Sequence, residues 1–375
     1  MKDQHDMIPL VDLKKQTRQL EREIQRAIGE VLADCHYVRG KWIEQFEEVF
    51  AQYCGGAYAS AVSSGTAALH LALLAAGVGP EDEVVTSPYT FIATAEAITA
   101  AGARPVFVDI LPGPFTIDPE KIEGVITRKT KAIIPVDLYG HPADLDAIRE
   151  VAQIYQLTVI EDACQATGAE YKGNPVGGTS HLTCFSFYPS KTLGALGDAG
   201  AVVTNDLRAV ENIRLRRDHG QTEPGVHEVE GYNARMDSIQ AAVLLVKLQY
   251  LNQWNAARRK HAKQYDELLR DVEGVSVPPV MEYANPVYAL YTIRVRNRDR
   301  LQAYLRQRGI STAVYYPIPL HLQAATRSLG YKEDDFPVAE TAAREVLSLP
   351  MYPELSEGEI SHVAESIREF YQGKG

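Results

Sequence analysis

The first two thirds of the chain alternate short apolar, β-branched runs with longer stretches of helical periodicity. Because strands of a parallel sheet are buried on both faces, near-continuous apolar runs favour such strands. The runs predict strands at Glu83–Ser87, Arg104–Asp109, Lys131–Val136, Leu157–Asp162, Cys184–Tyr188 and Gly200–Thr204. The stretches between them predict helices at Thr66–Gly77, Ile92–Ala101, Pro119–Ile126, Asp144–Tyr155 and Asp206–Arg217. This alternation indicates an α/β fold with a mostly parallel sheet.

The pattern changes after Asn233. Apolar positions at i, i+3, i+4, i+7 and i+11 from Ile239 to Tyr250 predict one long helix that runs on towards Leu269. A strand at Tyr288–Val295 and a helix at Asp299–Gly309 are expected beyond it. We therefore expect two domains: a large α/β domain with an N-terminal helical arm over residues 1–252, and a small α+β domain over residues 253–375.

Composition and charge narrow the class of protein. With 375 residues, 45% hydrophobic and 23% charged, the chain has an ordinary globular mix. Its formal net charge of −11 disfavours a nucleic-acid partner, although a small phosphorylated ligand needs only a local positive pocket. The first residues lack the apolar core of a signal peptide, and polar residues interrupt the Ala/Leu-rich stretch 57–79. We expect a cytoplasmic protein without a membrane span, and four scattered cysteines that form no metal site.

A small hydroxyl-rich turn, Ser63-Ser64-Gly65-Thr66-Ala67, stands directly before an Ala/Leu-rich helical run. The first N–H groups of a helix lack intrahelical partners and lie at the positive end of its dipole, so such a turn can hold a phosphate. The alternative is an ordinary N-cap by Ser or Thr. No glycine fingerprint for a dinucleotide follows a predicted strand.

Two carboxylates, Glu161 and Asp162, end an apolar strand at the carboxyl edge of the predicted sheet, where ligands of open α/β sheets bind. Adjacent residues of a strand face opposite ways, and Gln165 three residues on could reach the same pocket as Asp162. A carboxylate there can hold a proton on a ring nitrogen, as pyridoxal phosphate (PLP) chemistry requires. A solvated strand-end acid or a helix cap would give the same pattern.

Lys191 follows another predicted strand and is succeeded by Gly194, Gly197 and Gly200. A desolvated lysine has a lowered pKa and can form a Schiff base. Ser186, five residues earlier, could offer a hydroxyl to a phosphate in the same pocket. A lone surface lysine is the simpler interpretation, but the neighbouring turn and strand-end acid weaken it.

Seven segments together resemble the DegT/DnrJ/StrS family of nucleotide-sugar aminotransferases, which are fold-type I PLP enzymes. The resemblance covers nearly the whole chain and implies a mostly parallel central sheet with flanking helices and a smaller C-terminal domain. The segments are Ser64–Leu69, Pro88–Thr94, Glu161–Gln165, Phe185–Lys191, Arg217–Gly220, Gly231–Met236 and Tyr316–His321.

The resemblance implies roles for individual residues. Lys191 would be the Schiff-base lysine and the base that moves the proton, and Asp162 would pair with the pyridine nitrogen. Gln165 would contact the hydroxyl of the cofactor ring, and Tyr89 would stack on the face of that ring. The cofactor phosphate would be held by Thr66, Ala67, Ser186 and, from the partner subunit, Asn233. Shared contacts imply an obligate homodimer. The residues on the substrate side would be Arg235, Tyr315, Tyr316 and His321.

The implied reaction is ping-pong transamination. L-glutamate would leave as 2-oxoglutarate, and its amino group would pass to a keto-sugar on UDP or dTDP, in amino-sugar and polysaccharide biosynthesis. Ile8–Gln16 and Thr312–Leu320 are most similar to members that act at the sugar 3-position, and the 4-position is the alternative.

Other functions remain open from the sequence. A related subgroup dehydrates sugars with histidine in place of the Schiff-base lysine, and a PLP-dependent amino-acid lyase or a PLP-fold regulator of gene expression are further alternatives. Lysine at position 191 favours transamination over dehydration. The compact basic cluster Arg214, Arg216 and Arg217 is expected to border the anionic substrate or a helix C-terminus rather than DNA.

Overall fold

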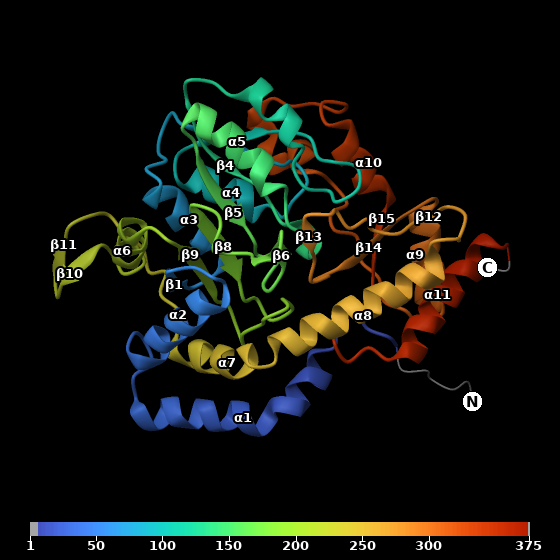
Figure 1. Cartoon of the computed structure of the whole chain (residues 1–375), viewed down its shortest axis with the longest axis horizontal. Coiled ribbons are helices and arrows are strands. Elements are labelled where there is room, and N and C mark those ends of the chain that lie inside the picture. Colours follow the sequence, from blue (N-terminus) through green and yellow to red (C-terminus); the bar gives the residue numbers. More distant parts are fainter. Residues whose placement is uncertain (1–6, 374–375) are drawn as a thin grey trace.

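The computed structural model describes residues 7–373, and a seven-stranded sheet organises its larger part (Figure 1). The strand order is β1-β9-β8-β5-β4-β2-β3. Strands β2, β3, β4, β5 and β8 are parallel, whereas β9 runs antiparallel between β8 and β1. The bounds are β1 Tyr58–Val62, β2 Glu83–Thr86, β3 Arg104–Phe107, β4 Thr130–Ile134, β5 Thr158–Asp162, β8 Leu182–Ser186 and β9 Gly200–Thr204.

Helices cover both faces of this sheet, as the strand sequences require. Val84 and Ile160 pack with one group of helices and Val85 and Val159 with another, because successive side chains of a strand face opposite ways. The flanking helices are α3 Gly65–Ala75, α4 Ala93–Ala100, α5 Leu145–Tyr155 and α6 Leu207–Arg216. The helices α1 Leu13–Asp34, α2 Lys41–Tyr53 and α7 Ser238–Leu248 pack together against β8 and β9. The mostly parallel α/β sheet predicted from the sequence is confirmed.

A smaller antiparallel sheet, in the order β12-β14-β15, organises the C-terminal part. Its elements are α8 Leu251–Leu269, β12 Val275–Ser276, β14 Tyr291–Val295, α9 Arg298–Gln307, α10 Pro337–Glu345, β15 Val346–Leu349 and α11 Glu357–Tyr371. Figure 1 shows α8 running from beside α7 into this part, where it packs on α11. The remaining strands are β6 Glu170–Tyr171, β7 Asn174–Pro175, β13 Ala284–Asn285 and a hairpin of β10 Gln221–Glu223 and β11 Val226–His227. Within residues 7–373, no helix is long and apolar enough to cross a membrane.

The first described residues pack on the C-terminal part. Ile8 is buried in the same apolar cluster as Tyr291 and Leu347, and its N–H donates to the Gly309 carbonyl at 2.8 Å. Met351 N donates to Leu10 O at 3.1 Å. The boundary expected at residue 252 therefore leaves out this strap of chain, which joins the small sheet from the opposite end of the sequence.

Two predicted elements differ in the structure, and one strand was not predicted. Residues 119–126 form two 3₁₀ turns, Pro119–Lys121 and Glu123–Val125, instead of an α-helix, and Gly124 is a poor helix former. The single helix expected from Ile239 to Leu269 is two helices, α7 and α8, which meet at Gln249 and Tyr250. Strand β1 was not predicted, because Tyr58–Val62 is rich in small residues with no clear β-branched run.

Candidate active site

A cavity of about 600 Å³ opens at the carboxyl ends of β5 and β8, beside the first turn of α3. This is where ligands bind in open α/β sheets, and the volume lies in the usual range for small-molecule sites. Seven of the sequence-predicted residues line it: Thr66, Asp162, Gln165, Ser186, Lys191, Tyr315 and Tyr316.

The first turn of α3 forms one wall of the cavity. Ser64 is the N-cap, and its Oγ accepts a hydrogen bond from Ala67 N at 3.1 Å. Ala68 N bonds to Ser64 O at 2.9 Å, and no hydrogen bond within the described chain uses the N–H of Gly65 or Thr66. Ser186 ends β8 so close to Gly65 that a Cβ added there would lie 2.7 Å from Ser186 Cβ. Two free N–H groups and a hydroxyl thus make a cradle suited to a phosphate.

The narrowness of this cradle gives a direct prediction. Gly65→Ala is expected to weaken phosphate-ligand binding about tenfold and to lower the free energy of unfolding by about 1–3 kcal/mol, because the new Cβ would also lie 2.9 Å from Cys164 Sγ. Gly29→Ala is the matched control, since a Cβ at Gly29 in α1 meets nothing within 4 Å and should slightly stabilise the helix. PLP titration and chemical denaturation measure both effects. If the two variants had the same PLP affinity and the same free energy of unfolding, the phosphate cradle at Gly65 would be refuted.

Asp162 is buried at the end of β5, with both carboxylate oxygens engaged. Oδ2 accepts from Thr94 Oγ1 at 2.8 Å, and Oδ1 accepts from Cys164 N at 3.2 Å. Glu161 faces the other way, where Ser180 and Thr183 donate to its Oε2 at 2.8 and 2.9 Å. The strand alternation expected from the sequence is confirmed here, and it leaves Asp162 as the carboxylate that faces the cavity.

Lys191 reaches the same cavity from the loop between β8 and β9. Burial lowers the pKa of its ammonium from the ordinary value of 10.5, and the nearby Cys164 and Asp162 partly oppose that shift. A lowered pKa raises the fraction of neutral amine near pH 7, which is the nucleophilic form. The structure therefore combines an activated amine and a fixed carboxylate in one cavity.

Val314, Tyr315 and Tyr316 bring the C-terminal part over the cavity. Tyr316 OH accepts from Gln165 Nε2 at 3.2 Å, and Gln165 Oε1 accepts from Tyr139 N at 2.8 Å. These bonds tie the segment to the end of β5 and orient the Gln165 amide.

Tyr89 does not line the cavity. Its side chain is 1% exposed, and its hydroxyl donates to Tyr315 O at 3.1 Å and accepts from Tyr316 N at 2.9 Å. This arrangement gives Tyr89 the task of anchoring the Tyr315–Tyr316 backbone and does not support the stacking expected of it. Phe91, two residues on, lines the cavity with a ring that is 56% exposed. Phe91 thus offers the cavity an exposed aromatic face that was not predicted from the sequence, although it lies in the same Pro88–Thr94 motif.

Three other expected residues lie away from this cavity. His321 is 2% exposed, with Nε2 3.1 Å from Glu340 Oε1, so this chain buries it in its core. Arg235 pairs with Asp218, with Nη1 2.6 Å from Oδ1. Asn233 is exposed beyond the β10–β11 hairpin. Within the described chain, none of the three faces the cavity that Lys191 lines.

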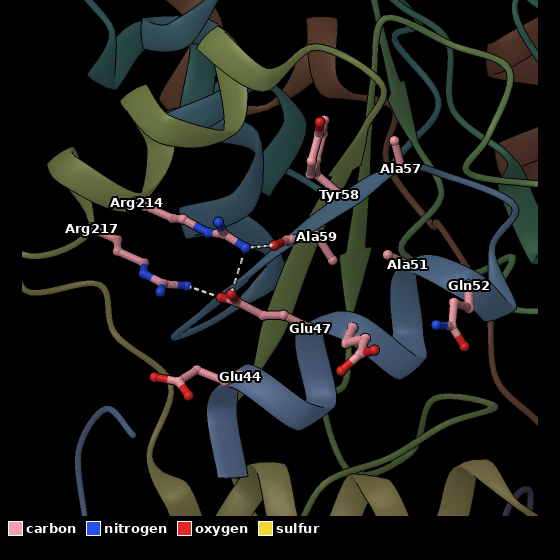
Figure 2. A pocket seen from close by; sticks show the side chains of 10 residues that line it. Glu44, Glu47, Ala51, Gln52, Ala57, Tyr58, Ala59, Arg214 and Arg217 are labelled. Atoms are coloured by element: carbon pink, nitrogen blue, oxygen red, sulfur yellow. Dashed lines mark hydrogen bonds and ion pairs between the residues drawn. The ribbon is translucent and has the colours of Figure 1, made fainter. Parts of the chain in front are cut away.

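The expected basic cluster lies beside a different cavity, of about 480 Å³, between α2, β1 and the end of α6 (Figure 2). Figure 2 shows Arg214 and Arg217 pointing at Glu47, and Arg214 Nη2 lies 2.8 Å from Glu47 Oε2. Glu47 also accepts from Ala61 N at 2.8 Å. The two arginines thus brace β1, which leads into the Ser64 turn. Of the two places expected for the basic cluster, the helix C-terminus is confirmed, because Arg214 and Arg216 lie in the last turn of α6 and Arg217 caps it, whereas none of the three lines the Lys191 cavity.

The donors around the Lys191 cavity fit PLP on structural grounds. The α3 N-terminus and Ser186 suit a phosphate, and a Cβ at Gly65 would fill their cradle. The buried Asp162 carboxylate suits a protonated ring nitrogen, and the Lys191 amine suits an aldehyde.

Comparison with known proteins places these features in a wider group. The model of the DegT/DnrJ/EryC1/StrS aminotransferase family matches residues 18–368. The "Pleiotropic regulatory protein" of Geobacillus stearothermophilus is 48% identical over 97% of this chain and 99% of its own. The dTDP-3-amino-3,4,6-trideoxy-alpha-D-glucose transaminase of Streptomyces venezuelae is 42% identical over 97% of this chain and 96% of its own.

Solved structures agree with the sequence comparisons. The crystal structure of S. venezuelae DesV in complex with a ketimine intermediate matches with a TM-score of 0.97 and 42% identity, covering 98% of this chain and 99% of that one. NtdA of Bacillus subtilis, with bound cofactor PMP, matches with a TM-score of 0.92 and 34% identity, covering 99% of this chain and 86% of that one.

Proposed function

Because the chain belongs to the DegT/DnrJ/EryC1/StrS aminotransferase family, and is thus a PLP-dependent aminotransferase, we propose that it moves the amino group of L-glutamate to the 3-position of a keto-sugar carried on dTDP or UDP. The observation that carries the proposal is the joint position of Lys191, Asp162 and the α3 N-terminus around one cavity. A buried lysine, a strand-end carboxylate or a helix N-terminus would have a simpler structural explanation if it stood alone. Together around one cavity, the three match the aldehyde, the ring nitrogen and the phosphate of PLP.

The residues of this chain divide the chemical work. Bound PLP supplies an aldehyde that takes up the amino group and a ring that withdraws electrons from the amino-acid Cα. Lys191 Nζ would hold the aldehyde carbon until the amino group of the donor displaces it. As a free amine, it would then take the proton from the donor Cα and deliver it to the former aldehyde carbon. Asp162 would keep the ring nitrogen protonated, with Thr94 and Cys164 N fixing its carboxylate. The N–H groups of Gly65 and Thr66, with Ser186, would hold the phosphate.

The sugar-nucleotide acceptor is supported by relatives rather than by this cavity alone. The S. venezuelae relative is named for a dTDP-3-amino sugar, and DesV matches nearly the whole chain. Tyr315 and Tyr316 line the cavity from the C-terminal part, where a large acceptor would contact the enzyme.

We also propose a homodimer with shared sites. Asn233 and Arg235 lie outside the cavity of their own chain, in a segment bridged to β1 through Val62 and Arg235. Asn233 is exposed and so able to serve a second copy, which supports the role expected for it on the partner's cofactor phosphate, whereas Arg235 is partly buried in its ion pair with Asp218. The activity of mixed inactive variants, described in the Discussion, tests this arrangement.

A half-reaction tests the amino donor. PLP-loaded enzyme and L-glutamate, with no sugar added, should release about one equivalent of 2-oxoglutarate per site. A panel of dTDP- and UDP-linked 3-keto and 4-keto sugars should then be added one at a time. The sugar that is the true acceptor should restore continuous release of 2-oxoglutarate. Failure to release 2-oxoglutarate would refute glutamate as donor, and sugar dehydration without it would favour the dehydratase alternative.

A regulatory role is the second candidate, because the Geobacillus relative is named a pleiotropic regulatory protein. The net charge of −11 speaks against direct binding to a polyanion. A mobility-shift assay with genomic DNA fragments at modest salt separates the two ideas. Sequence-specific retention would require a DNA-binding function beside the enzymatic one.

A further inference from the structure

The loop that carries Lys191 is held by a lysine on another element. Lys247, near the end of α7, is 2% exposed, and its Nζ donates to the Gly194 carbonyl at 2.7 Å. No other hydrogen bond to Gly194 O occurs among the described residues. A buried lysine is costly unless its ammonium is well paired, so its presence beneath a catalytic loop calls for a reason.

Gly194 is the closing position of the turn that contains Lys191. A Cβ at Gly194 would overlap the Pro189 carbonyl, so the backbones at these two positions lie against each other, one on each side of Lys191 in the sequence. Lys191 N also donates to Tyr188 O at 2.8 Å, and Ala195 N donates to Phe187 O at 2.8 Å. A group that fixes Gly194 therefore fixes both ends of the turn from which Lys191 projects.

Helix α7 contacts this loop at a second point on the same side. Gln240, seven residues before Lys247 and so two turns away, accepts from Leu196 N at 2.8 Å through Oε1. Leu193 and Ala195 are buried in the apolar cluster that includes Val243 and Leu244 of the helix. The helix thus seats residues 193–196 firmly, while residues 189–192 form the part that turns back to the cavity.

The protonation of Lys247 suits this task. Burial lowers its pKa to about 8, so near pH 7 the side chain is still mostly protonated and can donate to the Gly194 carbonyl. An apolar side chain of the same length would leave that carbonyl buried without its donor.

We propose that Lys247 is a positioning residue for Lys191: its Nζ fixes the Gly194 carbonyl and thereby holds the Pro189–Gly194 turn that directs Lys191 into the cavity. This inference rests on the proposed role of Lys191 as the amine that binds PLP. It adds to that role a residue that touches neither the cofactor nor the substrate.

The test is the rate at which apo-enzyme attaches PLP to Lys191, trapped with borohydride and located by mass spectrometry. Lys247→Met keeps the length and removes the donor, and its trapping rate should fall about tenfold or more, since a buried acceptor is left unpaired. Val246→Ala, one residue away in α7 and buried in the apolar cluster, is the matched control. It should lower the thermal midpoint and leave the trapping rate within about twofold.

Each outcome decides the matter. Trapping at the wild-type rate in Lys247→Met would overturn the positioning role, and so would an equal slowing in a Val246→Ala variant of equal thermal stability. Lys247→Gln, whose amide nitrogen ends one bond short of the lysine Nζ, provides the same comparison if the Met variant does not fold. Absence of a Lys191 adduct in the wild-type enzyme would instead refute the proposed function itself.

Discussion

Replacing Lys191 with alanine is expected to abolish covalent attachment of PLP and to lower kcat at least about a thousandfold, because one change removes both the nucleophile and the proton carrier. Lys263→Ala, on an exposed position of α8, is the matched control and should leave both unchanged. The measurements are the borohydride-trapped adduct, located by mass spectrometry, and 2-oxoglutarate release from L-glutamate. A borohydride-reducible PLP adduct that persists in the variant would show that another amine of the protein binds PLP.

The same variant tests the shared sites. If Asn233 reaches the partner's cofactor, then Asn233→Ala and Lys191→Ala dimers should each be impaired at both sites. Exchanging their subunits would create hybrids in which one site is intact, restoring roughly a quarter of wild-type activity in a random mixture. Absence of recovery, with hybrid formation verified by mass, would place Asn233 in the cavity of its own chain or outside catalysis.

Asp162→Asn is expected to lower kcat by about 10- to 1000-fold with little change in folding. A nearby carboxylate shifts the pKa of a paired group by about 1–3 units. Loss of the carboxylate therefore lowers the ratio of protonated to unprotonated ring nitrogen by about 10- to 1000-fold. The amide is isosteric and can still accept from Cys164 N, while Thr94 Oγ1 can turn to accept from the new amide group.

Two readouts separate this role from a structural one. The ring absorbance of bound PLP should report the loss of the nitrogen proton, and the denaturation midpoint should stay close to that of Asp146→Asn, an exposed control in α5. A variant that keeps its kcat would exclude Asp162 as the partner of the ring nitrogen. A variant that loses kcat only through unfolding would assign it to the core.

The parts of the site that lie at strand ends were predictable from the sequence. Asp162 and Ser186 end apolar runs, and in a parallel sheet such ends meet at one edge regardless of how the loops run. The Ser64 turn was equally visible, because its hydroxyls directly precede a helical pattern. Local pattern and sheet topology together suffice for these positions.

The rest depended on packing that no local pattern records. Tyr89 and Phe91 both stand in one aromatic motif, and only tertiary contacts decide that the first anchors Tyr315 while the second faces the cavity. His321 looks like a functional residue in sequence, yet Glu340 provides a partner that lets the core bury it. The break between α7 and α8 was invisible because apolar periodicity continues across it.

The strap formed by residues 8–10 has a consequence for biosynthesis. Ile8 pairs with Ile310, about 300 residues away, so at ordinary translation speeds the strap waits roughly 15–60 s for its partner to leave the ribosome. During that interval the large sheet can assemble without it, whereas the small sheet cannot be completed. Residues 8–10 are thus made long before their partner and dock late, so a fusion placed close before Ile8 would burden the final step of folding rather than an early one.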